Sequence, residues 1–585
     1  MAAVDVEKRG QVLLIGLNRP DKMNAFNLEM LEELTAAYGR LEEDQELRCG
    51  LLYARGDHFT AGLDLGEVAP EVRKGEGLFH PLRVDPLQIL KESRTIKPRN
   101  MSKSNGIREL QPQALWSNFA DLNQVPRPSK REERVIAFMK DFGEKLGLDT
   151  TVDEAGNVVI KKPASPGKEG RPTVILQSHL DMVHQKNADT DFDFEAEGIR
   201  SYVDGEWVTA EGTTLGADNG IGVAAIMTIL QSDSMVHPPL EALFTIDEET
   251  GMTGAKGLDE KLLQGKILLN LDSEEDDELT IGCAGGIDTN THMNYMEVTS
   301  NEGTVGFLLT IRGLKGGHSG LDIHLGRGNA NKLMNRLLYK TTYPFGLRIS
   351  SLDGGSLRNA IPRESTALVA VKGDKKEAFL QEFHTRKADI EREFSSIEPG
   401  LSITVKEVHA PVKVMKSEGQ EKVLTALYAV PNGVWRMSPD IPGLVETSSS
   451  LARVIVRNGE FITQSLQRSS IESGKMDVTN AVRAAFEAVG AKVENSGSYP
   501  GWAPDASSKI LKVMEGLYAE LFGDKPHVAA CHAGLECGII GEHYPGLDMI
   551  SFGPTIRHPH SPDEKVHIAS VGKFWKFLTA ALERV

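Results

Sequence analysis

The sequence predicts an α/β protein whose main domain is interrupted by an inserted α+β domain and preceded by a separate α/β segment. After residue 106, apolar β-branched runs alternate with amphipathic stretches, which is the pattern of a sheet covered by helices. Near Gly303 the order of the elements changes, and from Gly501 the first alternation resumes. The main domain is therefore predicted to be built from two separated stretches of the chain.

The composition restricts the class of protein. A length of 585 residues suggests three to four domains of about 150 residues each. The formal net charge of -18 argues against a nucleic-acid or anionic-membrane partner. No apolar run approaches the roughly 18 residues of a membrane span, and no signal-peptide pattern opens the chain. Because four scattered cysteines (Cys49, Cys283, Cys531, Cys537) suit neither a disulfide framework nor a thiolate zinc site, we predict a cytoplasmic protein.

The first 95 residues are predicted to form a small α/β segment. We expect strands at Val12–Leu17 and Gly50–Tyr53 and a helix across Leu28–Leu41. Through Asn18–Phe26 and His58–Leu65 the segment resembles the crotonase (enoyl-CoA hydratase/isomerase) superfamily. The resemblance implies that the backbone N–H of Leu63 is one donor of an oxyanion hole, which needs two donors. The second glycine-rich donor segment is missing, so we interpret residues 1–95 as a truncated domain, from a gene fusion or a gene-model artefact.

Residues 96–106 are polar and basic and are predicted to be a linker. We expect Ser129 to cap the second helix of the region that follows. The elements expected before residue 291 are helices at Ala114–Asn123, Glu132–Leu146, Ile221–Leu230 and Lys256–Leu263, and strands at Thr151–Val152, Val158–Lys161, Thr173–Gln177, Leu240–Ile246 and Ile267–Leu271.

Two successive segments of the insertion share an order of elements, which predicts two related α+β units. The first holds strands at Val305–Ile311, Leu347–Ser351, Ala367–Lys372 and Ser402–Val408 and helices at Asn329–Leu338 and Lys376–Phe394. The second holds strands at Leu451–Val456, Phe461–Leu466 and Lys492–Glu494 and a helix at Asp477–Val489. The chain then returns to the main domain with helices at Ser507–Phe522 and Ala569–Leu582 and strands at His527–Ala530 and Asp548–Ser551.

A histidine and an aspartate end the buried strand at residues 173–177. His179 and Asp181 are two residues apart, so in extended geometry both side chains leave the same face. A neutral imidazole is a good transition-metal ligand, and a nearby carboxylate can fix its tautomer. A solvated loop is the alternative for so short a motif.

Asp218 lies in a glycine-rich turn, Leu215–Gly222, that opens a helix. The glycines do not form a phosphate-binding pattern. Two interpretations of Asp218 stay open. Its carboxylate can bridge two metal ions with its two oxygens, or it can cap the helix.

Two further strands end in acids. Glu248 and Glu249 are adjacent, so they point to opposite faces: one can bind metal while the other acts as general base, with a solvated charge run as the alternative. Asp272 ends the next strand, and His560 is presented by a turn that Ser561-Pro rigidifies. Open α/β sheets bind ligands outside the carboxyl ends of their strands. We therefore expect these side chains to meet at one edge of the sheet.

The candidate ligands are two imidazoles and three carboxylates: His179, His560, Asp218, Glu249 and Asp272. Mixed nitrogen and oxygen ligation without thiolate suits two zinc ions, with cobalt or manganese as substitutes. If Asp218 bridges, each metal has one histidine and one terminal carboxylate, with room for a shared water. Such a site hydrolyses acyl bonds.

Seven motifs resemble the aminoacyl-histidine dipeptidases, which are Xaa-His-cleaving members of the co-catalytic dizinc exopeptidases: Ser178–Val183, Gly212–Gly220, Leu271–Glu275, Gly313–Gly320, Leu357–Arg363, His532–Gly538 and His560–Glu564. The resemblance implies a dizinc catalytic domain with an inserted lid and the same five metal ligands. It implies that Asp181 orients His179, that Glu248 is the general base and that His318 polarises the scissile carbonyl. It also implies substrate-binding roles for Asn359, Arg468 and Gly534.

These observations lead to a division of the chain into a truncated crotonase-like segment (1–95), a linker (96–106), the N-terminal stretch of the catalytic domain (107–290), the lid (291–498) and the C-terminal stretch of the catalytic domain (499–585). We expect hydrolysis of small peptides, preferentially Xaa-His such as β-alanyl-histidine, and a homodimer through the lid. The alternatives are a broader dipeptidase or deacylase, a CoA-thioester activity in the crotonase-like segment and a metal-free binding protein.

Overall fold

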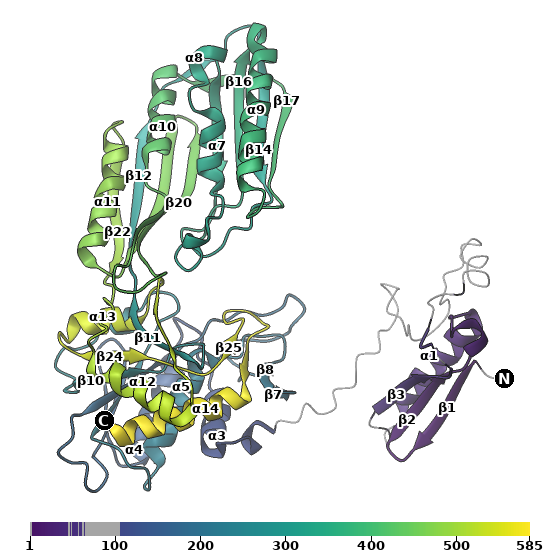
Figure 1. Ribbon diagram of the computed structural model, residues 1–585, viewed down its shortest axis with the longest axis vertical. Coiled ribbons are helices and arrows are strands. Elements are labelled where there is room, and N and C mark those ends of the chain that lie inside the picture. Colours follow the sequence, from purple (N-terminus) through teal and green to yellow (C-terminus); the bar gives the residue numbers. More distant parts are fainter. Residues whose placement is uncertain (1–2, 45–46, 48, 57, 61–63, 65–105) are drawn as a thin grey trace. The chain divides into compact units, whose positions relative to one another are not determined.

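The computed structural model in Figure 1 describes residues 3–44, 47, 49–56, 58–60, 64 and 106–585. The chain divides into two compact units, Met1–Asn105 and Gly106–Val585. Across the described residues, no helix is both long and apolar enough to cross a membrane.

The first unit is a three-stranded sheet with one helix. Strand β1 (Val4–Arg9) runs antiparallel to β2 (Val12–Leu17), which runs parallel to β3 (Cys49–Ala54). Helix α1 (Leu28–Glu43) begins after Asn27, whose side chain accepts the backbone N–H of Met30. The predicted strands and helix are confirmed, whereas Leu63 lies outside the described residues.

The second unit contains an eight-stranded sheet in the order β23-β11-β24-β10-β6-β9-β5-β4. Strand β6 is parallel to β9 and to β10, so the carboxyl ends of these three strands lie at one edge. The strands are β4 (Asp149–Val152), β5 (Val158–Lys162), β6 (Val174–His179), β9 (Leu240–Thr245), β10 (Ile267–Asn270), β11 (Glu278–Cys283), β23 (His527–Cys531) and β24 (Asp548–Ser551).

Burial explains why the central strands carry continuous apolar runs. All residues of β6 and β9 are buried, as expected for parallel strands covered on both faces. The main helices of this region are α3 (Gln113–Leu122), α4 (Glu133–Lys145), α5 (Ala217–Gln231), α12 (Lys509–Phe522), α13 (Glu536–His543) and α14 (Ile568–Arg584). Helix α5 is buried almost all round, which accounts for its apolar composition.

A small four-stranded sheet lies beside this core. It pairs β25 (Ile556–Arg557), β26 (Lys565–His567), β8 (Trp207–Ala210) and β7 (Ser201–Asp204) in that order. The turn between β25 and β26 carries His560. The pairing of β26 with β8 therefore ties this turn to the segment that precedes α5.

The insertion folds as a nine-stranded antiparallel sheet with helices packed against it (Figure 1). Its strands are β12 (Gly285–Asn294), β14 (Thr304–Arg312), β15 (Arg348–Gly354), β16 (Ser365–Lys372), β17 (Ser402–Val408), β19 (Gly433–Met437), β20 (Val445–Arg457), β21 (Glu460–Ser469) and β22 (Lys492–Tyr499). Its main helices are α7 (Ala330–Leu338), α9 (Lys376–Phe394), α10 (Ser417–Ala429) and α11 (Glu472–Glu487).

The strand order agrees with two related units. Outward from the junction of β15 with β20, one side reads β15, β16, β14, β17 and the other reads β20, β21, β12, β22. In each unit this is the second, third, first and fourth strand. The junction itself joins three pairs of residues, from Leu352 opposite Val456 to Gly354 opposite Val454.

Two predictions about local structure are wrong. Ser129 does not cap α4, which follows Glu132; instead the Ser129 hydroxyl donates to Asp181 Oδ2 at 2.8 Å. The helix expected at residues 256–263 is a single turn, α6 (Thr253–Lys256), that ends at Gly257. Ser129 has the residue type of a cap, but a tertiary hydrogen bond engages its hydroxyl. The second segment has a helical apolar pattern, but the helix ends at Gly257.

Candidate metal centre

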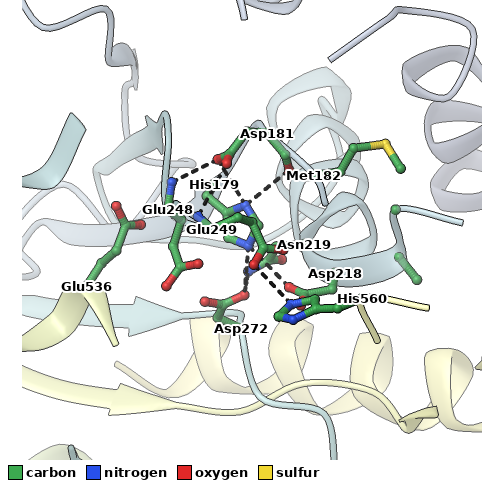
Figure 2. A network of polar contacts seen from close by, with 12 residues as sticks. His179, Asp181, Met182, Asp218, Asn219, Glu248, Glu249, Asp272, Glu536 and His560 are labelled. Carbon is green, nitrogen blue, oxygen red and sulfur yellow. Dashed lines mark hydrogen bonds and ion pairs between the residues drawn. The ribbon is translucent and has the colours of Figure 1, made fainter. Parts of the chain in front are cut away.

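Four of the predicted ligands come from the carboxyl ends of β6, β9 and β10 and from the start of α5. His179 is the last residue of β6 and pairs with Thr245 at the end of β9. Glu249 follows β9, and Asp272 follows β10 after one residue. Figure 2 shows these side chains converging with Asp218 and with His560 from the turn before β26. The edge of the parallel strands thus holds all five.

The five side chains form two groups that share Asp218. His179 Nε2 lies 3.1 Å from Asp218 Oδ1 and 3.4 Å from Asp272 Oδ1. His560 Nε2 lies 3.4 Å from Asp218 Oδ2 and 2.9 Å from Glu249 Oε2. The two oxygens of Asp218 therefore face different histidines. This is the arrangement that a bridging carboxylate requires, and the Asp218 side chain does not act as a helix cap.

Asp181 sits behind His179 and is fully buried. Its Oδ1 lies 3.3 Å from His179 Nδ1, and its carboxylate accepts the backbone N–H groups of Glu248 at 3.1 Å and Glu249 at 3.3 Å. Burial opposes the charge, but the hydrogen bonds from His179 and Ser129 and the backbone N–H of Glu248 hold the pKa of Asp181 below its ordinary value. One carboxylate thus fixes both the imidazole and the strand end that carries the two glutamates.

The charges of the cluster fit a pair of divalent cations. Burial raises the pKa values of Glu249 and Asp272, and Glu249 Oε1 is buried without a hydrogen-bond partner. Hydrogen bonds with Asp218 and Glu249 raise the pKa of His560 to about 11. Burial opposes a charge on His179, yet the neighbouring carboxylates, Asp272 first, raise its pKa well above the ordinary value. The carboxylates of the cluster therefore favour positive charge on both imidazoles, as they would favour bound cations.

Glu248 differs from Glu249 in its surroundings. Figure 2 shows its carboxylate between Glu536 and Asp272, away from His560. Burial, with the nearby charges of Asp272, Glu249 and Glu536, raises the pKa of Glu248 well above its ordinary value. A general base must hold the proton that it takes from water until it passes the proton on. A raised pKa gives the Glu248 carboxylate this property.

The four predicted substrate-binding residues, three in the insertion and Gly534 after β23, also lie together, outside the ligand cluster. Arg468 Nη1 donates to the Tyr499 hydroxyl at 2.9 Å, and Nη2 lies 3.5 Å from His318 Nε2. The carbonyl of Asn359 accepts the backbone N–H of Ser319, next to His318. Gly534 packs on the Tyr499 ring, where an added Cβ would lie 3.1 Å from a ring carbon.

Several buried polar residues of the centre were not predicted. Asn219 donates to Asp272, and Glu536 accepts from Gln177 at 2.8 Å and Thr245 at 2.5 Å. Burial raises the pKa of Glu536 to about 8. Glu564 accepts backbone N–H groups of the turn that carries Asp218. Glu536 and Glu564 stand inside motifs that were recognised, but nothing in the sequence marks their side chains as buried.

Known proteins resemble both units of the chain. Residues 175–584 match the sequence profile of Peptidase family M20/M25/M40. The cytosol non-specific dipeptidase of Escherichia coli (strain K12) is 43% identical over 477 residues, which cover 82% of this chain and 98% of that protein. The crystal structure of aminoacylhistidine dipeptidase from Vibrio alginolyticus is 46% identical, with a TM-score of 0.78, over 82% of this chain and 98% of that one.

Residues 7–93 match the profile of Enoyl-CoA hydratase/isomerase. The enoyl-CoA hydratase EchA19 of Mycobacterium tuberculosis (strain ATCC 25618 / H37Rv) is 37% identical over 97 residues, which cover 16% of this chain and 35% of that protein. The first unit thus corresponds to about a third of that relative.

Proposed function

The chain belongs to peptidase family M20/M25/M40 and is a hydrolase, and from this premise we propose that it cleaves unblocked dipeptides, preferentially Xaa-His such as β-alanyl-histidine. The predicted fold class and both predicted resemblances are confirmed by the matches. The observation that carries the proposal is the pair of histidine–carboxylate groups joined through Asp218.

Two divalent cations would be held by these groups, one by His179, Asp218 and Asp272 and the other by Asp218, Glu249 and His560. We propose zinc as the natural ion, with cobalt or manganese as substitutes, because the donors are imidazole and carboxylate without thiolate. When bound, such cations lower the pKa of a water molecule and polarise an acyl oxygen. The buried, unpartnered Glu249 Oε1 supports the assignment, because a buried acceptor needs a partner.

Glu248 would transfer the proton. Its carboxylate takes one proton from the attacking water and gives it to the nitrogen of the leaving amino acid, so the C–N bond breaks with no net change at the enzyme. Asp181 would keep His179 in the orientation that presents Nε2 to the cation, since its Oδ1 lies 3.3 Å from Nδ1.

The lid would bind the substrate. Arg468 is only 5% exposed, and its nearest polar groups are the Tyr499 hydroxyl and His318, whose pKa burial lowers to about 4. Among the described residues no carboxylate is hydrogen-bonded to this buried guanidinium, so it favours an anion such as the C-terminal carboxylate of a dipeptide. His318 would face the scissile carbonyl, and Asn359 and Gly534 would complete the site.

We extend the proposal to the organisation of the chain. Residues 107–290 and 499–585 would form the catalytic domain and residues 291–498 the lid, although residues 285–290 belong to β12 and pair within the nine-stranded sheet. Residues 1–95 would be a truncated appendage joined by residues 96–106. A cytoplasmic location and a homodimer through the lid remain predictions.

The test is hydrolysis of β-alanyl-histidine, a panel of Xaa-His dipeptides and matched dipeptides without histidine. The full chain is assayed before chelation, after chelation and after zinc is returned. Loss on chelation and recovery with zinc would support the metallodipeptidase. Equal rates across the panel would favour the broader dipeptidase, and no hydrolysis with metal bound would refute the proposal.

A further inference from the structure

Glu564 is buried beneath the turn that carries Asp218, with 2% of its surface exposed. Its Oε2 accepts the backbone N–H groups of Leu215 at 2.7 Å and Gly216 at 2.9 Å. Its Oε1 accepts those of Ala217 at 2.8 Å and Asp218 at 3.3 Å. A single carboxylate therefore satisfies four consecutive donors that end at the bridging ligand.

The opposite side of the same turn is held by Arg127. Its guanidinium is fully enclosed and donates to the carbonyl of Gly216 at 2.6 Å. Gly216 has φ +69°, and an added Cβ would lie 2.5 Å from Arg127 Nη2. Arg127 thus binds a carbonyl of the turn and Glu564 binds its N–H groups. The position of Asp218 therefore depends on Glu564.

Glu564 also fixes the turn that presents His560. Its backbone N–H donates to the carbonyl of Ser561 at 2.9 Å, and its carbonyl accepts the Thr209 hydroxyl at 2.8 Å. His560 itself has φ +60° and a side chain that is 53% exposed, so little packing holds the imidazole. Its place opposite Asp218 and Glu249 depends on the turn.

We propose that Glu564 is a positioning residue that couples the Asp218 turn to the His560 turn and thereby sets the affinity of the cation site formed by Asp218, Glu249 and His560. The inference rests on the proposed function only in that this centre binds cations. The other site shares Asp218 but has further supports, because Asp181 holds His179 and Asn219 donates to Asp272. The effect should therefore be larger at the site that contains His560.

The test is a cobalt(II) titration of the chelated full chain, followed by calorimetry and visible absorption, with no peptide present. Glu564→Gln keeps the shape but replaces one oxygen by an NH₂ group, so two of the four backbone donors lose their acceptor. The second equivalent of cobalt(II) should bind about 10- to 100-fold more weakly than in the unmodified protein. The first equivalent should lose clearly less affinity, because its site shares only Asp218 with the displaced turns.

Asp563→Asn is the matched control, because Asp563 is the exposed neighbour of Glu564 and its loss changes the local charge equally. Glu564→Asp is a second variant for the case that the glutamine form does not fold: it keeps the charge but is too short to reach all four donors, and should also weaken the second site. Unchanged binding of both equivalents in the folded variant, or the same loss in Asp563→Asn, would overturn the inference. If the unmodified protein takes up no cobalt(II), the proposed function itself fails.

Discussion

Loading the metal-free protein with two divalent cations should release protons at pH 7.5, and His560 should account for about one of them. In the metal-free centre, hydrogen bonds with Asp218 and Glu249 raise the pKa of His560 to about 11, so this ring carries a proton at that pH. The neighbouring carboxylates also raise the pKa of His179 above its ordinary value. An imidazole binds a cation only in its neutral form. His560 must therefore give up one proton when its site is filled.

The proton count can be measured by calorimetric titration in buffers of different ionisation enthalpy at one pH. The observed heat plotted against the buffer enthalpy has a slope equal to the number of protons released. The affinity of each site should rise about tenfold per pH unit while its histidine remains protonated, and hydrolysis should fall below about pH 6 as protons displace the cations. His560→Ala should lower the slope by about one. A slope that His560→Ala leaves unchanged would refute the assignment of a protonated His560 ring.

The same raised pKa values give a sign for stability. A histidine whose pKa is higher in the folded than in the unfolded chain stabilises the fold fully below the unfolded value of about 6.5. This contribution of His560 is lost as the pH rises towards about 11. In chelator, the unfolding temperature of the protein should therefore fall across that range, and cations should offset the loss because they take over the role of the protons.

Three other predictions concern single changes. Glu248→Ala should retain both cobalt(II) equivalents in a titration yet lose roughly 10²- to 10⁴-fold in kcat, and equal loss of metal would contradict a role as base. Arg468→Ala should raise KM for a dipeptide roughly tenfold to a hundredfold. KM for the corresponding dipeptide amide, which lacks the carboxylate, should not rise. An equal rise in KM for both substrates would exclude carboxylate binding. A chain shortened to residues 106–585 should keep kcat/KM within about twofold, since this unit is compact by itself. A large loss would give the first unit a role in the reaction.

The sequence predicted the strand ends of the centre well because these depend on local patterns. The run from Val174 to Leu176 is apolar and β-branched enough to predict a buried strand, and His179 follows it after two residues. Parallel neighbours then bring Glu249 and Asp272 to the same edge without further information. The prediction that these side chains lie near His179 thus depends on the parallel pairing of the strands and not on the composition of the loops.

The supporting residues could not be predicted, because their partners are distant in the chain. Glu564 binds the N–H of Leu215, 349 residues earlier, and Gln177 donates to Glu536, 359 residues later. Ser129 has the residue type of a helix cap, but its hydroxyl bonds to Asp181 instead. A local propensity worth about 1 kcal/mol gives way when tertiary packing offers the same group a buried, charged acceptor.

The junction of β15 with β20 gives the lid the symmetry of a dimer within one chain. Both strands are the second of their unit and they meet antiparallel, so the contact is isologous: each half offers the other the same edge. Such a contact closes on itself, and the sheet cannot grow by repeating it. Among the described strands of this sheet, β17, β22 and β19 pair with one neighbour each and keep an edge that another strand could join. The contact between β15 and β20 thus covers one edge of each half without offering a site for further growth.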